Sequence, residues 1–304
     1  GVQTFNFEGE NTVGTLSASQ YAKYVLAAAD AKLTAPAELT VTTDLKDHSV
    51  KYVDGAYVVV GNKVAIGETT YATLADAIIA AQAGDTIKFL ADINENVTID
   101  KNLTIDGAGK QYTGKMTANA GLTVTVQNVN FVNGGFDKST KSTTGAYTIK
   151  NCTFDGAGTF AYSFRFRGAN KVTIEDCTVK NYLYSFLYIN SGTNTVSVKN
   201  VTVEDCPNYA VYFGSGVNNA TFENLTVKNS ENGFIINNTA NRAFTIKDCK
   251  MVDVENAISE ANGTNSITCT ALGLNDFGTA AISQYAKFVL GTTDAKLTAP
   301  AELT

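Results

Sequence analysis

The stretch TIEDCTV at residues 173–179 recurs as SVKNVTV at residues 197–203 and as TFENLTV at residues 221–227. Each of these copies begins 24 residues after the previous one. A fixed period of this length, with small apolar residues that alternate with polar ones, is typical of a stacked β-solenoid in which each coil contacts its neighbours. Two further copies extend the series, TIKNCTF at residues 148–154 and TIKDCKM at residues 245–251.

The period converts the sequence into rows of equivalent residues on successive coils. The second residue of each copy is apolar, and the fourth is always Asn or Asp. Asn and Asp tolerate positive φ at a sharp turn, and an Asn amide can bond to the backbone or to the next Asn. The fourth-position row consists of Asn151, Asp176, Asn200, Asn224 and Asp248. A second row, usually preceded by Gly and a small residue, consists of Asn170, Asn194, Asn218, Asn241 and Asn265.

A third apolar run lies before the second Asn of each coil, as in SFRFRG at residues 163–168 and FLYINS at residues 186–191. Three short strands and three turns per coil predict a mainly β protein, a right-handed parallel β-helix. In this fold, inward side chains stack on their equivalents roughly 4.8 Å away, the spacing of hydrogen-bonded strands. We expect Phe164, Leu187 and Val211 to point inward on this third strand.

The remaining sequence predicts three regions. Residues 1–66 form a small α+β N-terminal module, in which SASQYAKYVLAAADAKL is expected to be helical. The following VTTDLKDHSVKYVDGAYVVVGN is expected to form strands that turn at Asp54 and Gly55. Residues 67–278 form the β-helix, with a helix at residues 71–83. Residues 279–304 form a C-terminal helix that partly copies residues 17–40.

The helix expected at residues 71–83 has an N-cap candidate in Thr73, and Gly84 ends it. A helix followed by coils resembles the N-terminal cap of pectate-lyase-like β-helix proteins, which implies that it covers the open end of the core. The motif IGETTYATLADAIIAAQAGDTIKFLADI, residues 66–93, also resembles a segment of large surface proteins of gut bacteria. This resemblance implies an adhesin-type repeat protein at the bacterial cell surface or cell wall.

The end of the chain nearly duplicates its beginning. SQYAKFVLGTTDAKLTAPAELT at residues 283–304 differs from residues 19–40 only at Phe288 and at residues 291–293. One interpretation is a parent protein of tandem modules, so that neighbouring modules of the same chain are partners. The other is a C-terminal cap, an amphipathic helix over the last coil.

Composition excludes several classes of function. The 304 residues carry a formal net charge of −6, which argues against nucleic acid or an anionic membrane as a partner. No apolar run approaches the length of a membrane span, so we expect no membrane insertion. The single His, His48, argues against a zinc site, and we expect no metal and no cofactor. Cys152 and Cys177 share an inward row with Val and Leu, as buried apolar residues, although a disulfide between these neighbouring coils is conceivable.

Many pectate-lyase-like proteins cleave polysaccharides, and the resemblance places their active sites on the outward face of the third strand. Alternation puts Arg165, Tyr188 and Tyr212 outward there, with Glu260 the only acid close by. A glycosidase needs two carboxyl groups, and a calcium-dependent lyase needs several acidic oxygens. A lyase or hydrolase would therefore need turn acids to converge beside Arg165. The candidates are Asp137, Asp155 and Asp205.

Other charged residues follow the coils. The outward row that alternates in sign is expected to pair opposite charges across strands, which is a scaffold role. It consists of Lys150, Glu175, Lys199, Glu223 and Lys247, and a shorter row consists of Lys180, Glu204 and Lys228.

Tyrosine and arginine remain as candidate binding residues. Tyr rings stack on sugars or peptides at low entropic cost, and Arg adds directional hydrogen bonds. We predict a non-catalytic, secreted or cell-surface module, an adhesin that binds a polysaccharide or a host surface protein. The alternatives are a polysaccharide lyase or glycoside hydrolase around Arg165, and a passive stalk or spacer whose tyrosines only cover the core. The candidate ligand-binding residues are Arg165, Arg167, Tyr184, Tyr188, Tyr209 and Tyr212.

Overall fold

The computed structural model divides the chain into two compact units. Unit 1 comprises residues 1–81 and 87–93, and unit 2 comprises residues 82–86 and 94–304. The structure describes residues 2–14, 21–138, 145–168, 171–190, 195–214, 217, 219–237 and 239–300.

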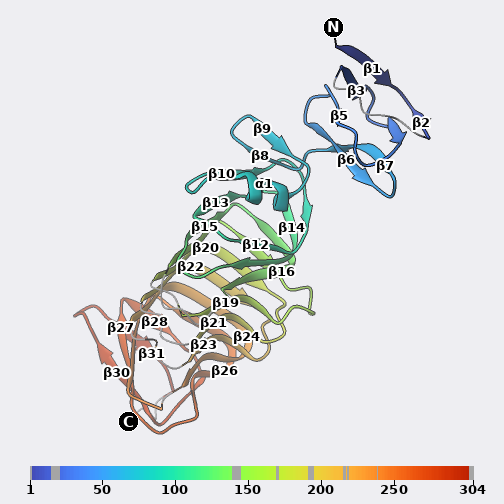
Figure 1. Ribbon diagram of the computed structural model, residues 1–304. Helices are drawn as coiled ribbons and strands as arrows, with labels where there is room; N and C mark the ends of the chain where they lie inside the picture. The colour runs from blue at the N-terminus through green and yellow to red at the C-terminus, as the bar shows by residue number, and fades with distance from the viewer. Residues whose placement is uncertain are drawn as a thin grey trace. The chain divides into compact units, whose positions relative to one another are not determined.

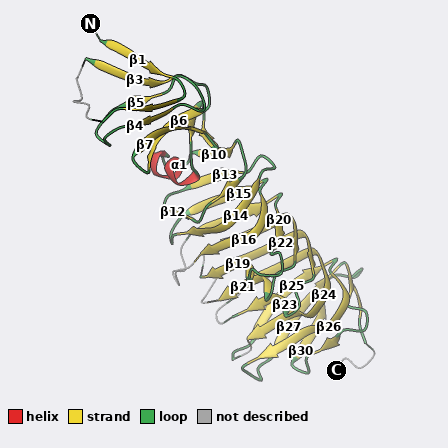
Figure 2. Cartoon of the chain, turned by 90° about the vertical axis from the view of Figure 1, so that its right-hand side faces the viewer, coloured by secondary structure: helices red, strands yellow, loops and turns green. Residues whose placement is uncertain are grey.

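Unit 2 is a parallel β-helix (Figures 1 and 2). One coil contains β17 (Ala146–Lys150), β18 (Thr153–Asp155) and β19 (Tyr162–Arg167). The next coil contains β20 (Lys171–Lys180), which pairs in parallel with both β17 and β18, and β21 (Ser185–Asn190), which pairs in parallel with β19. The mainly β fold and the coiled parallel architecture predicted from the repeats are therefore confirmed.

The same parallel pairing continues along unit 2. The strands before the coil just described are β12 (Val97–Ile99), β13 (Leu103–Asp106), β14 (Gln111–Ala118), β15 (Thr123–Gln127) and β16 (Asn130–Lys138). The strands after it are β22 (Thr195–Glu204), β23 (Tyr209–Phe213), β24 (Asn219–Asn237), β25 (Arg242–Lys247), β26 (Lys250–Ala261), β27 (Ile267–Leu272) and β28 (Leu274–Asp276), followed by β29 (Ala281–Ile282), β30 (Ala286–Leu290) and β31 (Lys296–Thr298).

The core of unit 2 consists of in-register rows of apolar side chains. The row predicted on the third strand is buried, with Phe164, Leu187 and Val211 all 0% exposed. Aromatic rings extend such contacts from coil to coil, and the rings of Phe131 and Phe154 stack with centroids 4.4 Å apart. Burial of a large apolar side chain contributes about 1.5–3 kcal/mol, so these rows supply the main driving force for the stack.

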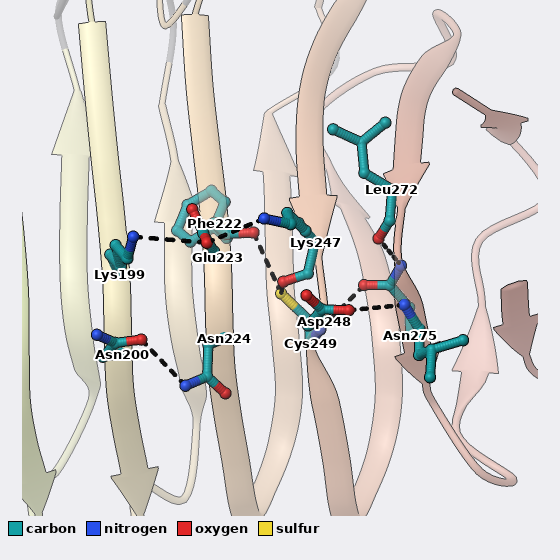
Figure 3. Close-up of polar contacts among 11 residues, drawn as sticks. Lys199, Asn200, Phe222, Glu223, Asn224, Lys247, Asp248, Cys249, Leu272 and Asn275 are labelled. Atoms are coloured by element: carbon teal, nitrogen blue, oxygen red, sulfur yellow. Dashed lines mark hydrogen bonds and ion pairs between the residues drawn. The ribbon is translucent and has the colours of Figure 1, made fainter. Parts of the chain in front are cut away.

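The turn between the first two strands of each coil depends on a residue in the left-handed region. Asn151, Asp176, Asn200, Asn224 and Asp248 all have φ of 53–54°. Three members of the row are also bonded in series, because Asn200 donates to the Asp176 carboxylate at 2.8 Å, and Asn224 donates to Asn200 at 3.1 Å (Figure 3). The Asp248 carboxylate accepts the backbone N–H of Leu274 at 2.7 Å.

The second Asn row is described only in part. Asn170, Asn194 and Asn218 lie outside the described residues. Asn241 accepts the backbone N–H of Ser266 on the next coil at 3.3 Å.

Another row of left-handed residues, which the sequence reasoning did not find, lies at the turn after the second strand. Asn181 donates to Asp155 at 2.9 Å, and Asn229 donates to Asp205 at 3.0 Å. The residues of this row with positive φ are Asn133, Asn181, Asp205, Asn229 and Asp253, and on the coil between Asn133 and Asn181 the positive φ is at Ala157, one residue beyond the row.

Unit 1 contains the one helix of the described residues. Helix α1 spans Leu74–Ala80, and Thr73 caps it by accepting the Asp76 N–H at 3.1 Å, as its sequence predicted. The helix is shorter than the predicted residues 71–83, because Ala81 already has an extended backbone, with ψ of 147°.

The other elements of unit 1 are strands. The predicted turn at Asp54 and Gly55 joins β6 to β7, which pair antiparallel. The strands are β1 (Gln3–Phe7), β2 (Glu10–Thr12), β3 (Ala22–Leu26), β4 (Lys32–Thr34), β5 (Val41–Thr42), β6 (His48–Val53), β7 (Ala56–Gly61), β8 (Val64–Ile66) and β9 (Thr69–Tyr71). In the chain, β10 (Thr86–Phe89) and β11 (Ile93–Asn94) follow α1.

The helix predicted within SASQYAKYVLAAADAKL is wrong. Within the described residues this segment forms β3 and β4, so the first 66 residues are not an α+β module there. The physical reason is tertiary pairing, because β3 bonds in parallel to β1 on one side and to β5 on the other. These backbone bonds override the helical propensity of the alanines at residues 27–29.

The helix predicted at residues 279–304 is also wrong. The described part of this segment forms β29, β30 and β31, which continue the parallel stack on β26, β27 and β28. The duplicated sequence therefore adopts the same strands at both places, β3 and β4 at the first and β30 and β31 at the second.

Candidate functional site

Strand alternation aligns the candidate residues on one outward face of unit 2. Asp137 on β16, Arg165 on β19, Tyr188 on β21 and Tyr212 on β23 are register partners on successive coils. Their neighbours along each strand, such as Phe164 and Leu187, are buried. The inward and outward assignment made from the sequence is therefore the one found in the structure. We call this surface the tyrosine–arginine face and define it by Asp137, Tyr162, Arg165, Arg167, Tyr184, Tyr188, Tyr209 and Tyr212.

The tyrosines of this face stack on one another. The rings of Tyr188 and Tyr212 are parallel within 3°, with centroids 4.9 Å apart. Tyr209 lies against Tyr212 at 5.7 Å. Tyr162, which the sequence reasoning did not select, stacks on Tyr184 at 5.7 Å and meets Tyr188 edge-on at 5.5 Å.

The tyrosines differ in their access to solvent. Tyr184 is 46% exposed, and the side chains of Tyr188, Tyr209 and Tyr212 are partly exposed. Tyr182, which lies in the same stretch of sequence, is instead fully buried and donates its hydroxyl to the Gly134 carbonyl at 2.7 Å. The interpretation that tyrosines only cover the core therefore fits Tyr182, but not the partly exposed rings of the face.

Charged residues gather at one end of the face. The Asp137 side chain is only 5% exposed and is shared between two cations, Lys115 at 2.6 Å and Arg165. Arg165 also bonds through its Nε to Asp137 at 3.2 Å, which makes the pair bidentate, and its guanidinium lies 5.9 Å from the centroid of the Tyr162 ring. The carboxylate thus orients Arg165 beside the tyrosines.

The ion pairs determine the protonation of this cluster. Burial by itself would raise the pKa of Asp137, but the hydrogen bonds from Arg165 and Lys115 outweigh it and lower the pKa below its usual value. The bond to Asp137 raises the pKa of Arg165 in turn. Burial, reinforced by the neighbouring Tyr162, raises the pKa of Tyr209. At neutral pH the Asp137 carboxylate is therefore ionised beside the Arg165 cation, and the Tyr209 phenol is neutral.

A pocket of about 330 Å³ opens beside these charges. Gly135 permits the close approach of the chains that shape it, since a Cβ there would lie 2.7 Å from the Tyr162 carbonyl oxygen. The lining mixes aromatic rings with Lys115, Asp137 and Arg165. The sequence reasoning missed Lys115, Phe160 and Tyr162, because no repeat links β14 or the turn before β19 to the tyrosine rows. The available signal for Tyr162 was a tyrosine three residues before Arg165 in the same strand.

Arg167 lies two residues beyond Arg165 on the same strand, and its side chain is partly exposed. Its register partner is Asn190 on the next coil. Asn190 donates to the Tyr188 hydroxyl at 2.9 Å, so polar groups continue the face beyond the stacked rings.

The acids that a lyase or hydrolase would need do not all meet at Arg165. Asp137 does, but both its oxygens bond to cations. Asp155 instead bonds to Lys180 at 3.3 Å, and together with Asp205 it lines a separate hollow of about 600 Å³ next to Tyr182. Across the described ranges, no group of three or more His, Cys, Asp or Glu side chains is placed to hold a metal ion.

The outward charge row forms ion pairs around Glu223 (Figure 3). Glu223 accepts from Lys247 at 3.1 Å and lies 3.5 Å from Lys199. Hydrogen bonding from Lys247, with the charge of both lysines, lowers the pKa of Glu223. These contacts agree with the scaffold role predicted for the row.

The five cysteines are buried free thiols, so Cys152 and Cys177 are not joined by a disulfide. Burial raises the pKa of Cys206 and of Cys249 to about 11. Among the helices in the described ranges, none has the length and apolar character needed to cross a membrane.

The family comparison agrees with this fold. A family described as "Right handed beta helix region" matches residues 139–287, which confirms the predicted right-handed parallel β-helix. A solved structure titled "L. reuters 100-23 SRRP" is similar with a TM-score of 0.41 and 14% sequence identity, over 71% of this chain and 90% of that chain. A search of curated proteins found no match.

Proposed function

We propose that the chain is a non-catalytic, secreted or cell-surface bacterial β-helix module, of adhesin type, which binds an acidic polysaccharide along the tyrosine–arginine face. The observation that carries the proposal is the row of partly exposed tyrosine rings on successive coils beside Arg165. Successive rings lie 4.9–5.7 Å apart, so a chain molecule laid across the coils could contact several of them. The surface location rests on the resemblance of residues 66–93 to segments of bacterial surface proteins.

Charge favours an acidic ligand over a neutral one. Lys115, Arg165 and Arg167 outnumber the single carboxylate of Asp137, so these four residues carry an excess of positive charge in a chain whose formal net charge is −6. Arg binds carboxylate and sulfate groups through directional hydrogen bonds, whereas Tyr faces pack on the apolar faces of sugar rings. A uronate-containing or sulfated glycan combines both chemistries.

Non-catalytic binding is favoured because the one carboxylate at the site is not free to react. A general acid needs a raised pKa, and a nucleophile needs an unshielded oxygen, but the pKa of Asp137 is lowered and its oxygens accept from two cations. Cleavage at Arg165 stays as the competing outcome of the test, and binding of a host protein is another.

The test is calorimetric titration of the purified chain with neutral, uronate-containing and sulfated oligosaccharides, together with an assay for reducing or unsaturated products. We expect binding of an acidic oligosaccharide without product. Tyr188→Ala/Tyr212→Ala should weaken it by roughly 10- to 100-fold, because each stacked ring contributes about 0.5–1.5 kcal/mol. Tyr21→Ala is the matched control, since Tyr21 is a 61% exposed tyrosine on unit 1.

Arg167→Gln separates charge from stacking. It should weaken binding of the acidic oligosaccharide and leave any binding of its neutral analogue unchanged. Release of product by the unmodified chain would replace binding with catalysis, and would make Arg165 the next residue to vary. Failure to bind any oligosaccharide would overturn the proposal and leave a protein ligand or a spacer role.

A further inference from the structure

The two ends of the chain contain the same structural element. Residues 267–271 of β27 pair with residues 286–290 of β30, and residues 3–7 of β1 pair with residues 22–26 of β3, all in parallel. Every residue of the second pairing lies 264 positions before its equivalent in the first. The pairing of β2 with β4 is likewise equivalent to that of β28 with β31.

The equivalence includes individual hydrogen bonds, although the sequences of β1 and β27 differ. Asn11 donates to the Glu8 carbonyl at 3.0 Å, and Asn275 donates to the Leu272 carbonyl at 2.8 Å. Gly9 and Gly273, which follow Glu8 and Leu272, have φ of 64° and 62°. The bonds from Val13 N–H to Thr34 and from Phe277 N–H to Thr298 both measure 2.8 Å. The described residues between 2 and 34 thus repeat the arrangement of the last coil of unit 2.

The two copies differ in the solvent exposure of equivalent side chains. In the first copy, Val25 and Leu26 are 2% and 0% exposed. Their equivalents in the second copy, Val289 and Leu290, are 40% and 57% exposed, at the C-terminal end of the stack of unit 2 (Figure 1). The sequences of the two strands, AKYVL and AKFVL, are almost the same, so the difference comes from the surroundings.

The cover of the first copy is the segment that follows it, residues 41–61. β5 extends the sheet in parallel beside β3, and β7 pairs antiparallel with β4. Tyr57 on β7 joins the apolar cluster around Tyr24, Leu26 and Leu33, and its hydroxyl lies 2.9 Å from both the N–H and the carbonyl oxygen of Leu39. Strand pairing and an apolar cluster therefore hold this segment on the closing coil.

We infer that the exposed surface of β30 and β31 is a docking site for a segment with the sequence of residues 41–61, supplied by a following module of the same parent protein. The parallel edge of β30 receives the equivalent of β5, and β31 receives the equivalent of β7. Phe288, Leu290 and Leu297 then form the apolar cluster that Tyr24, Leu26 and Leu33 form in the first copy. This docking does not involve the tyrosine–arginine face. It would join the end of one β-helix to the module that follows it.

An extended chain tests this inference. Residues 41–61 are added after residue 304, and amide hydrogen exchange is measured with and without the extension. Peptides from the two copies are distinguishable, because they differ at Phe288 and at residues 291–293. We expect exchange in residues 286–298 to slow to the level of residues 22–34. An extension that carries Tyr57→Ala is the matched control and should protect these amides less.

A second variant keeps the test decisive if the extension folds poorly. Leu290→Asp should leave thermal unfolding of the original chain nearly unchanged, since Leu290 is already 57% exposed, and should lower the midpoint of the extended chain. Equal exchange with and without the extension would overturn the inference. Concentration-dependent dimerisation of the original chain that is abolished by Leu290→Asp would also overturn it, because a second copy would then be the occupant.

Discussion

At the scale of single residues, the fold depends on a backbone conformation that few side chains accept. The row of Asn and Asp at the first turn has φ of 53–54°, a region that costs most L-residues roughly 1–2 kcal/mol each. Asn and Asp reduce this cost because their short side chains bond locally. In this protein they also bond to the equivalent residue on the neighbouring coil, as Asn200 does to Asp176.

Substitutions at Asn200 separate the tolerance of positive φ from the side-chain bonds between neighbouring coils. Asn200→Gly removes the side-chain bonds to Asp176 and Asn224 but accepts positive φ, whereas Asn200→Ala also introduces backbone strain. We expect Ala to lower the free energy of unfolding by about 1 kcal/mol more than Gly, as measured by urea titration. Equal effects of the two variants would show that backbone strain is not important at this turn.

The carboxylate of Asp137 provides a prediction about pH. Its pKa is lower in the folded state than its ordinary value of 3.8. Its ion pairs therefore stabilise the fold fully above the ordinary pKa, and this stabilisation is lost as the pH falls through the lower, folded-state pKa. Asp137→Asn should lower stability at pH 7 by roughly 1–3 kcal/mol, because the cations lose their partner.

The measurement is thermal unfolding between pH 2 and pH 7. The melting temperature of the original chain should approach that of Asp137→Asn at the acid end. A constant difference across this range would contradict the assigned ion pairs. Asp54→Asn, at the turn between β6 and β7 in unit 1, serves as the control for general acid effects.

At the scale of elements, each strand is determined by its neighbours as much as by its own sequence. The segments AKYVL and AKFVL share one local sequence pattern, and both pair in parallel with a strand that comes earlier in the chain. The outward charged side chains also depend on the strands beside them. Glu223 lies between Lys199 and Lys247, where opposite charges on adjacent strands attract.

Reversing one charge tests this row. Glu223→Lys places three lysines side by side on β22, β24 and β25, and should lower the melting temperature at low ionic strength. Because these side chains are partly exposed to solvent, the loss should diminish as salt is added. Glu231→Lys is the control, since Glu231 is also on β24 but outside the row. An effect independent of salt would indicate that packing, and not charge, holds the row.

At the scale of the whole molecule, a solenoid is stabilised by contacts between adjacent coils, so local opening should depend on position along the stack. The five buried cysteines are natural probes of this opening, because they lie on successive parts of unit 2 from Cys152 to Cys269. Burial raises the pKa of Cys249 to about 11 and also raises that of Cys269, so in the closed state both are protonated and unreactive.

We expect thiol labelling under native conditions to modify Cys269 first. Cys269 lies on β27, one coil from the exposed strand β30, whereas Cys206, whose pKa is also raised by burial, lies between β22 and β23, farther from that end. Mass spectrometry after timed labelling gives the order, and denaturant should make all five thiols equally reactive. Labelling of Cys206 before Cys269 would contradict opening from the C-terminal end.

The amino-acid sequence was enough to predict the parallel β-helix, the inward rows and the outward stripe that contains Arg165, Tyr188 and Tyr212. It could do so because a repeating coil places equivalent residues in the same environment, so that all five copies predict the same local structure. It also located the left-handed turn row, since Asn or Asp at the same position of every copy indicates a turn that requires positive φ.

Features that depend on neighbours outside the repeat could not be predicted in this way and became visible in the folded chain. Lys115 and Asp137 are 22 residues apart on irregular early coils, and their meeting with Arg165 requires the stacking of β14, β16 and β19. Tyr182 and Tyr184 are two residues apart, yet one is buried and the other exposed, because a turn interrupts the alternation. The duplicated ends were predicted to be helices and are strands, because backbone pairing with distant strands outweighs the local propensity on which sequence reasoning relies.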